Sequence, residues 1–598
     1  MKKNVIKLLI SILFIAIAPL ALVAQDYSWT QGKPSLSFVD KAGNILVKDT
    51  KGSHFLHKLY KSMYETPIWV TDKGLTNFGK KIMGIISKDK SVPRAVTKEY
   101  TIKVKQEIKN LKADKGGTIQ DKLILELDIS RLYKKYTDYL IYGGIDWTTF
   151  KSKLAALKKA KGADFGWIVY TSAKTPISIL KNAINTGSLK NALKAAEPTR
   201  FNYAKLKNYL LKYIRINESG KWKKLPRFST KIRSGHSSNA IPAIKNNLTL
   251  TGDLKGCQED KSSTVYDKCL LKAVKHFQIR YGLTVDGVIG RGTYERINTP
   301  LTRKIRLMRL NMDRIKRLRH KSEKVRIELN VPSFRLNVID HNSLVDTIRV
   351  ITGRPNHPTP IFGSKIQYIV VNPWWKIPES IVRAEMLKHL IVDPYYYERR
   401  GKILTKTWDE NSPRIDPGTI DWAKYRDKHT YMPFHFMQVP GAHNALGKIK
   451  FIFPNRFSVY IHDTPVKSIF FNTRRARSHG CMRIQKPREL LKVFASYNDN
   501  INVEDIMQRL QGTKKKILGL SHKIPVDITY LTAYVDPYGY LNFRNDIYNY
   551  DKYTLKDYKY KVDRYHKESS QKRKKKKATA TAKKTDNSGY QISEVYPQ

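Results

Sequence analysis

The sequence predicts an α+β protein of several domains, in which a helical scaffold and a small helical module precede a β-rich domain with an inserted cap. The chain has 598 residues, 41% of them hydrophobic, which is enough for several cores. Apolar residues recur at helical spacing up to about residue 300, and from Val325 the period changes to two. This alternation is interrupted between Ile377 and Phe436, so we expect the cap at about 378–435 within a β-rich domain at 323–552.

The first 24 residues have the pattern of an export signal. Lys2, Lys3 and Lys7 precede an apolar run from Leu8 to Ala24. The small residue at its end suits cleavage, and a retained inner-membrane anchor is the alternative. We therefore expect the rest of the chain to work outside the cytoplasm, in the periplasm or cell envelope.

The net charge of +60 predicts anionic partners. Nucleic acid would fit the charge, but export excludes it as a functional partner and leaves membrane lipids and wall carboxylates. Residues 553–598 contain the run Lys572-Arg-Lys-Lys-Lys-Lys577 and are expected to be a basic, solvated tail. The tail either only improves solubility or tethers the protein to an anionic membrane or wall.

Residues 25–240 are expected to form the helical scaffold. Between Tyr60 and Tyr213 the chain is rich in Lys, Leu, Ala and Ile at helical spacing, as in Phe150–Ala160 and Ile177–Ala195. It shows no clustered carboxylates, no metal-ligand spacing and no Gly-rich phosphate loop. A scaffold is therefore a better interpretation than an independent activity.

A small helical module is expected at 241–300, with a basic connecting helix at 301–322. An apolar stripe ends at Gly282, and Thr293 opens a further short helix. The stripe consists of Leu270, Val274, Phe277 and Tyr281. The segment, with Asp286-Gly287-Val-Ile-Gly290, resembles the peptidoglycan-binding domain of wall enzymes. The resemblance implies glycan or peptide binding, and a purely structural role is the alternative.

Several strands and one helix are expected in the β-rich domain. Val325, Ile327, Leu329 and Val331 alternate with polar neighbours. Further strands are predicted at Phe334–Val338, Ile366–Val371, Lys448–Phe453 and Phe457–Ile461, and a hairpin joins Tyr530–Val535 to Leu541–Phe543. Within the cap, Ser380–Leu390 is predicted to be helical.

The three cysteines are predicted to divide into one disulfide and one free thiol. Cys257 and Cys269 lie 12 positions apart in one small segment, so we pair them. Cys481 is then left over, and an unpaired thiol in an oxidising compartment calls for a functional explanation.

Cys481 lies in Ser478-His479-Gly480-Cys481-Met482-Arg483, nineteen positions after His462. Phe457, Val459 and Ile461 lie on one face of the expected strand, and His462 lies on the other. His462 therefore points away from the core and could be the base that a thiol needs. Arginines bracket the thiol and are expected to lower its pKa and attract a carboxylate-bearing substrate. They are Arg474, Arg475, Arg477 and Arg483.

This set of residues has two other interpretations. Cys481 could be an inert buried thiol beside histidines that are satisfied by structural contacts. His462, His479 and Cys481, with His443, could also bind zinc. The spacing matches no metal pattern, so neither a metal nor another cofactor is expected.

His462, Ser478-His-Gly-Cys481 and Arg483 resemble the catalytic signature of the L,D-transpeptidase family. The resemblance extends over about residues 55–552 and is to the large members, which combine a helical scaffold, a peptidoglycan-binding module and a β-rich catalytic domain with a cap. Further matching segments are Gly353-Arg-Pro355, Thr359-Pro360, Asn372-Pro-Trp-Trp375, Pro378, Pro440-Gly441, Asn444-Ala-Leu-Gly447 and His462-Asp-Thr-Pro465.

The resemblance implies an acyl transfer between peptidoglycan stem peptides. Cys481 would attack the carbonyl of the third residue and release D-alanine, and an amine of a second stem would then attack the thioester. His462 would take the thiol proton, and the backbone carbonyl of Asp463 would orient it. Backbone N–H groups around Gly480 and Cys481 would meet the oxyanion, with His479 in a supporting role.

Substrate contacts are expected from the side chains of Ser478, Arg483, Arg475, Tyr460 and Asn444. The partners implied are stem peptides and glycan, and the protein is expected to be a monomer. The same thiol could instead transfer the acyl group to water, as an L,D-carboxypeptidase, or attach proteins to the wall. A non-catalytic peptidoglycan-binding protein is the remaining alternative.

Overall fold

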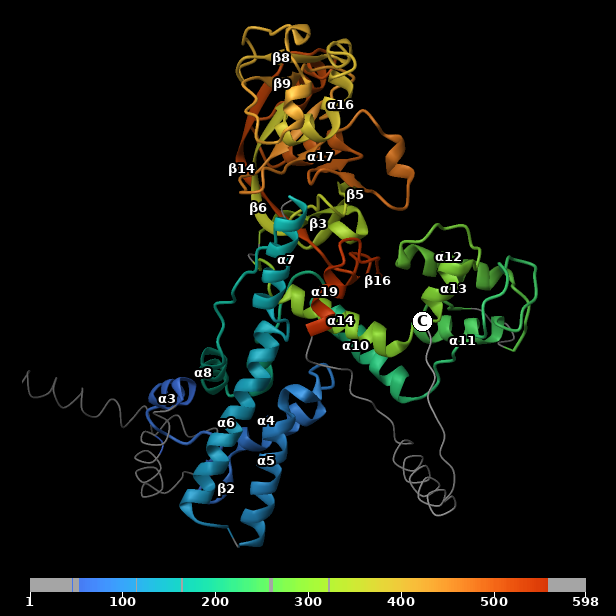
Figure 1. Ribbon diagram of the computed structural model, residues 1–598. Helices are drawn as coiled ribbons and strands as arrows, with labels where there is room; N and C mark the ends of the chain where they lie inside the picture. Colours follow the sequence, from blue (N-terminus) through green and yellow to red (C-terminus); the bar gives the residue numbers. More distant parts are fainter. Residues whose placement is uncertain are drawn as a thin grey trace, which may run out of the picture.

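The computed structural model of this chain describes Leu46 and residues 53–114, 116–162, 165–256, 262–320 and 323–557. The helical scaffold lies at one end, the β-rich domain at the other, and the small helical module to one side (Figure 1). This is the α+β multidomain architecture that the change of hydrophobic period predicted. The expected export signal at 1–24 and residues 558–598 of the expected basic tail lie outside the described residues.

The scaffold is built from amphipathic helices with defined starts. Thr118 and Asp121 form a capping box at the start of α6, and Thr175 caps α8, which has Pro176 in its first turn. Two short strands, β1 (Val70–Thr71) and β2 (Gly74–Leu75), form a small hairpin. The helices are α3 (His54–Lys61), α4 (Asn77–Lys88), α5 (Arg94–Ala113), α6 (Ile119–Tyr142), α7 (Trp147–Lys161), α8 (Pro176–Thr186), α9 (Leu189–Ala196) and α10 (Tyr203–Glu218).

The small module and the helix after it share one core with α10. The predicted apolar stripe lies on α12, which ends at Gly282 with a positive φ of 62°. The helices are α11 (Ile241–Thr251), α12 (Lys268–Tyr281), α13 (Arg291–Ile297) and α14 (Leu301–Ile315). The prediction of a helix after the module is right, but its interpretation as a linker is wrong. Arg309 and Arg314 of α14 are each 1% exposed, so this helix is a core element.

The β-rich domain contains a nine-stranded sheet in the order β12-β5-β13-β11-β10-β6-β14-β3-β4, and a further pairing joins the end strand β4 to β5, the strand next to the other end. Its strands are β3 (Val325–Asn330), β4 (Arg335–Asp340), β5 (Ser343–Gly353), β6 (Phe362–Val371), β10 (Ile449–Ile452), β11 (Ile461–His462), β12 (Ala476–Ser478), β13 (Met482–Ile484) and β14 (Lys516–Thr529). Two helices, α17 (Pro487–Ala495) and α18 (Val503–Arg509), contribute apolar side chains to its core.

The cap is a separate unit with its own hydrophobic cluster, which contains Leu390, Trp422 and Phe436. Its three-stranded sheet has the order β7-β9-β8. The strands are β7 (Trp375–Ile377), β8 (Lys402–Thr405) and β9 (His435–Gln438). The predicted helix at Ser380–Leu390 is present as α15 (Glu379–Ile381), a π-helical turn (Val382–Met386) and α16 (Leu387–Leu390). Such π-helical turns are frequent at functional sites.

The hydrophobic cores do not follow the linear order of the regions. Phe150 of α7 and Trp167 belong to the core of the β-rich domain, and the backbone N–H of Ile168 donates to the carbonyl of Ile361 at 2.8 Å. The predicted hairpin forms between β15 (Ala533–Val535) and β16 (Leu541–Phe543) but packs into the core of the small module. The three regions are therefore joined by shared cores.

One strand prediction needs correction, and one helical stretch is interrupted. Phe457–Ile461 is not a strand, because Ser458 has a positive φ of 54° and pairing begins only at Ile461. The helical spacing at Ile177–Ala195 corresponds to two helices, since Gly187 ends α8 in a left-handed conformation and Ser188 caps α9.

Of the two cysteines that the structure describes, one is bonded and the other is free. Cys269 takes part in a disulfide, and Cys481 is a free thiol. Cys257 lies outside the described residues, so its pairing with Cys269 stays a prediction. Among the helices that the structure describes, none has the length and apolarity needed to cross a bilayer.

Candidate active site

Cys481 lies on a tight turn between β12 and β13. Gly480 has a φ of 115°, a conformation that side chains with a Cβ rarely adopt, so this turn requires glycine. The hydroxyl of Ser478 donates to the carbonyl of Cys481 at 2.6 Å and accepts the N–H of Gly480 at 3.3 Å. The carbonyl of Gly480 accepts a hydrogen bond from Thr359 at 2.8 Å. These bonds hold the thiol-bearing turn in one conformation.

The strand β11 brings His462 beside this turn. It pairs in parallel with β13, so that Ile461 is opposite Met482 and His462 is opposite Arg483. Ile461 faces the core, and His462 faces the other side, as the alternation predicted. His462 is nevertheless only 4% exposed.

Cys481 and His462 line the same cavity, which has a volume of about 780 Å³. The turn that carries Cys481, strands β10 and β11, and the cap helix all contribute to its walls. From the cap come Ser380, Ile381, Ala384 and Glu385, and the aromatic residues include Trp374, Trp375 and Tyr460. The cap therefore forms one side of the cavity that contains the thiol.

Burial keeps both reacting groups neutral. It lowers the pKa of His462 to about 3, and the charges of Arg483 and Lys450 act in the same direction. The backbone carbonyls of Asp463 and Leu446 oppose this shift. Burial also raises the pKa of the Cys481 thiol, although Tyr460, Lys450 and Arg483 act to lower it. The free site thus holds a thiol and a neutral imidazole at pH 7.

Lys450 and Tyr460 complete the surroundings of the thiol. The Lys450 ammonium lies 3.8 Å from the centroid of the Tyr460 ring. Burial raises the pKa of Tyr460, as does the neighbouring Cys481 thiolate. Burial lowers the pKa of Lys450, whereas the Cys481 thiolate raises it. Both side chains are therefore coupled electrostatically to the sulfur.

The cap contacts the turn that carries Cys481 through a cluster of polar side chains. Nε2 of His479 lies 2.7 Å from Oε1 of Glu385 on the cap helix and 2.7 Å from a guanidinium nitrogen of Arg354. Arg354 also reaches Glu385 at 3.4 Å. The cluster joins the cap, the end of β5 and the residue two positions before Cys481.

Comparison with known proteins identifies the domain that carries this site. Residues 324–504 match the family described as the L,D-transpeptidase catalytic domain. The segment that carries Cys481 and His462 is therefore similar to the L,D-transpeptidase catalytic domain. Residues 54–210 match a scaffold domain, and residues 237–297 match a family described as "Putative peptidoglycan binding domain".

A curated relative has the same catalytic description. A Haemophilus influenzae protein named "Putative L,D-transpeptidase" is 31% identical over 230 residues, which are 38% of this chain and 44% of the relative. The match thus spans less than half the length of that relative.

Two solved L,D-transpeptidase structures show low overall similarity. One from Mycobacterium smegmatis has 9% identity and a TM-score of 0.16 over 34% of this chain and 58% of the other. One from Stackebrandtia nassauensis has 14% identity and a TM-score of 0.20 over 51% of this chain and 95% of the other.

The expected site residues of this domain divide into two groups. Ser478, His479, Cys481, Arg483, Tyr460 and His462 all line the cavity. Nε of Arg483 and Nδ1 of His462 are buried polar atoms without a hydrogen-bond partner among the described residues. These two atoms are available to a bound substrate or to a small rearrangement of the backbone carbonyls.

The side chains of two expected substrate contacts, Arg475 and Asn444, act on the backbone instead, as does that of Asp463, which was expected to act through its backbone carbonyl. Arg475 donates to the carbonyls of Val350, Asn472 and Phe334, and it does not line the cavity. The amide of Asn444 donates to the carbonyls of Pro373, Gln438 and Val439. The carboxylate of Asp463 accepts the N–H groups of Lys448 and Thr464. These side chains hold loops in place, a role that depends on the positions of the loops and could not be inferred from the residue types alone.

The expectation that the four arginines lower the thiol pKa is confirmed for Arg483, but burial outweighs this effect. The net direction is upward because burial dominates, and Arg483 is the one arginine among the charges that act on Cys481. Arg474 and Arg477 are exposed and do not line the cavity. Within the described residues, no group of three or more His, Cys, Asp or Glu side chains is placed to hold a metal.

Lys450 and Glu385 were not identified from the sequence. Lys450 alternates with the core residues Ile449 and Phe451 on the predicted strand, so its face could have been inferred, but the pairing with His462 could not. Glu385 is one of several charged residues in the cap, and nothing in its spacing distinguishes it.

Proposed function

We propose that this protein is a cysteine-dependent L,D-transpeptidase that joins third-position residues of peptidoglycan stem peptides. The observation that supports it most directly is the free thiol of Cys481, which shares one cavity with His462 inside the matched catalytic domain. The cavity of about 780 Å³ has the size of a site for a short peptide.

The chemistry begins from a neutral pair. As the Cys481 sulfur attacks the carbonyl of the third residue, the thiol proton passes to the imidazole of His462, so no free thiolate accumulates beforehand. The tetrahedral oxyanion would be met by backbone N–H groups around Gly480 and Cys481. Breakage of the peptide bond releases D-alanine, whose nitrogen takes the proton, and leaves a thioester.

A carboxylate-bearing substrate suits the charge of the cavity. Arg354, Lys376, Lys450, Arg483 and Lys515 line it against the two carboxylates of Glu385 and Glu410. The buried Nε of Arg483 lacks a partner, so it is the donor that a substrate oxygen would satisfy. The second step is attack on the thioester by a side-chain amine of another stem, which the same imidazole would deprotonate.

The remaining regions fit work at the wall. The match to a peptidoglycan-binding family supports retention on glycan or stem peptides, and the amino-terminal pattern supports export. We propose a location in the cell envelope, with Arg- and Lys-rich surfaces drawn to wall carboxylates.

The test is the intact mass of the protein after incubation with a tetrapeptide stem donor. A tripeptide adduct is expected on the native chain and not on Cys481→Ala. The Lys448→Met variant is a matched control, because Lys448 directly precedes β10 but does not line the cavity. Absence of an adduct on folded native protein would refute the proposal.

Product analysis then identifies the acceptor. A dimeric product formed from two stems supports cross-linking, whereas release of free tripeptide alone would show transfer to water and would replace the proposed activity by that of an L,D-carboxypeptidase.

A further inference from the structure

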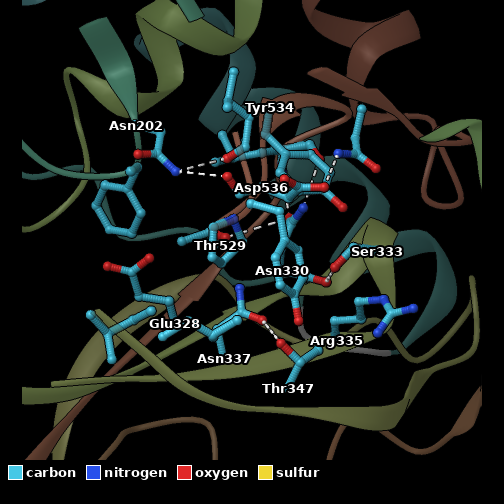
Figure 2. Close-up of a pocket in the computed structure, with 18 of the residues that line it drawn as sticks. Asn202, Glu328, Asn330, Ser333, Arg335, Asn337, Thr347, Thr529, Tyr534 and Asp536 are labelled. Carbon is cyan, nitrogen blue, oxygen red and sulfur yellow. Dashed lines mark hydrogen bonds between the residues drawn. The ribbon is translucent and has the colours of Figure 1, made fainter. Parts of the chain in front are cut away.

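A second pocket lies where three parts of the chain meet, and it shares no lining residue with the cavity around Cys481. Its volume is about 450 Å³. The start of α10 forms one wall, strands β3 and β4 form another, and the turn between β15 and β16 forms a third. In Figure 2, Asn202 lies on one side of the pocket, and Asn337 with Thr347 lies on the other.

The walls are held in place by hydrogen bonds between these parts. The amide nitrogen of Asn202 donates to the carbonyls of Val535 at 3.2 Å and Asp536 at 3.0 Å, which fixes the hairpin turn against α10 (Figure 2). The amide oxygen of Asn337 accepts from Thr347 at 3.0 Å. The pocket is therefore preformed, which lowers the entropic cost of binding a ligand.

The amides keep unused hydrogen-bonding capacity. Each Asn side chain has two donors and one acceptor. Among the described residues, the oxygen of Asn202 and the nitrogen of Asn337 have no partner. A peptide or acetamide group needs one donor and one acceptor, and these two side chains provide both from opposite walls.

The lining is strongly cationic. Five of its side chains are Lys or Arg, and two are carboxylates. Glu328 accepts from Arg200 at 3.1 Å and from Arg326 at 2.9 Å, so this carboxylate is already used. The Asp536 carboxylate accepts the N–H of Tyr540 and the amide of Asn542.

Three cations of the lining form no ion pair with an acidic side chain among the described residues, but one of them, Arg544, donates to the carbonyls of Arg280 and Phe543 and to the amide oxygen of Asn542. The side chains of the other two form neither an ion pair nor a hydrogen bond within that part of the chain. They are Arg335 on β4 and Lys205 on α10, and both are exposed to solvent. One comes from the β-rich domain and the other from the scaffold, so a ligand between them would bridge the two regions.

The charges of further arginines near Arg335 add to the positive charge of this region. Arg335 is paired with Arg349 across β4 and β5. Burial lowers the pKa of Arg475 to about 10, and the charges of Arg335, Arg349 and Arg544 act in the same direction. This repulsion shows that four guanidinium groups lie close together, with the carboxylate of Asp536 acting on Arg544 alone among the four.

We propose that this pocket binds a ligand with a free carboxylate next to an amide, which Arg335 and Lys205 hold by charge and Asn202 and Asn337 hold by hydrogen bonds. A guanidinium pairs with a carboxylate through two parallel hydrogen bonds, which makes it the preferred partner for this group. The wall offers this chemistry in stem peptides and in an N-acetylated acidic sugar. The choice of wall material as the source rests on the proposed function.

Binding is measured by calorimetry and by ligand-observed NMR on the full chain carrying Cys481→Ala, so that no acyl transfer interferes. The first probe is the N-acetylated dipeptide N-acetyl-L-alanyl-D-glutamate, which lacks a third residue for the thiol to attack, and its neutral control is the corresponding diamide. The second probe is N-acetylmuramic acid, with N-acetylglucosamine as the neutral control.

At least one acidic probe is expected to bind about tenfold or more tightly than its neutral control. The probe that binds identifies the source as peptide or sugar. Arg335→Gln and Lys205→Gln should each weaken that binding about tenfold. Arg488→Gln is the matched control, since Arg488 is exposed on α17 and lies outside both pockets.

A loss of affinity that is equal in Arg488→Gln would show attraction to the total charge of the protein and would overturn the proposal. Binding that neither Arg335→Gln nor Lys205→Gln changes would overturn it as well, as would absence of binding by both acids. Thermal unfolding verifies that each variant is folded, and Lys205→Gln keeps the test valid if Arg335→Gln is not. Failure of acylation by Cys481 would leave this result unaffected.

Discussion

Lys450 and His462 are direct partners across the antiparallel strands β10 and β11, on the face that lines the cavity. This register places a second cation beside the thiol, in addition to Arg483. The Lys450 charge lowers the pKa of both Cys481 and His462. It therefore favours the thiolate and at the same time keeps the imidazole free of a proton.

Replacing Lys450 with Met should slow acylation while leaving the fold intact. Loss of the charge raises the thiol pKa further, so we expect kcat/KM at pH 7 to fall by about tenfold and the pH profile to shift to higher pH. Lys448→Met is the control, because Lys448 donates to the carbonyl of Gly512 and does not line the cavity. An unchanged pH profile in Lys450→Met would show that the charge does not act on the thiol.

The reactivity of Cys481 should depend on pH as that of a buried thiol does. His462 has a pKa of about 3 and stays neutral, so it forms no ion pair with the sulfur in the free protein. Because burial raises the thiol pKa, alkylation by iodoacetamide should rise about tenfold per pH unit from pH 6 to 9. A rate that is already constant below pH 7 would instead indicate a preformed thiolate–imidazolium pair.

Glu385→Gln tests the contact between the cap and the turn that carries Cys481. The substitution removes the ion pair with Arg354 and the carboxylate that contacts Nε2 of His479, but it preserves the side-chain shape. Since the cap forms one wall of the cavity, we expect KM for the donor to rise several-fold with a smaller change in kcat. Glu379→Gln is a matched control, because Glu379 pairs with Arg383 on the cap and does not line the cavity. Equal effects of both variants would show a general loosening of the cap.

Local sequence patterns predicted the helices, the strands and the turn that carries Cys481. Features that depend on tertiary packing could not be predicted from these patterns. The alternation at Val325–Val331 and the stripe on α12 are each encoded within a few residues, so they were found. The burial of Cys481 depends on strands that lie far apart in the chain, and it reverses the direction of the pKa shift that the nearby arginines suggested. The sequence of the helix at Leu301–Ile315 is basic, which suggested an exposed helix. In the structure, its Arg314 pairs with the buried carboxylate of Asp551, about 240 positions away.

The scaffold contains a buried carboxylate whose removal should destabilise the protein. Glu126 accepts the N–H groups of Ile68, Trp69 and Val70, at 2.7 to 2.8 Å, and the hydroxyl of Tyr60 at 2.8 Å. Glu126→Gln replaces one acceptor oxygen by a donor that faces these N–H groups. Each donor left unsatisfied costs about 1–3 kcal/mol, so we expect the free energy of unfolding to fall by about 2–4 kcal/mol.

Denaturant unfolding of the full chain measures this loss, with Glu99→Gln as the control. Glu99 is exposed on α5 and its ion pair with Lys103 spans 4.0 Å, so this change should leave the unfolding free energy within about 0.5 kcal/mol. Burial raises the pKa of Glu126 to about 7, against the four hydrogen bonds. The folded state therefore binds a proton more readily than the unfolded chain, and the contribution of Glu126 should decline as pH rises from about 4.3 through 7. Glu126→Gln should abolish that part of the pH dependence, and its persistence would mean that another group causes it.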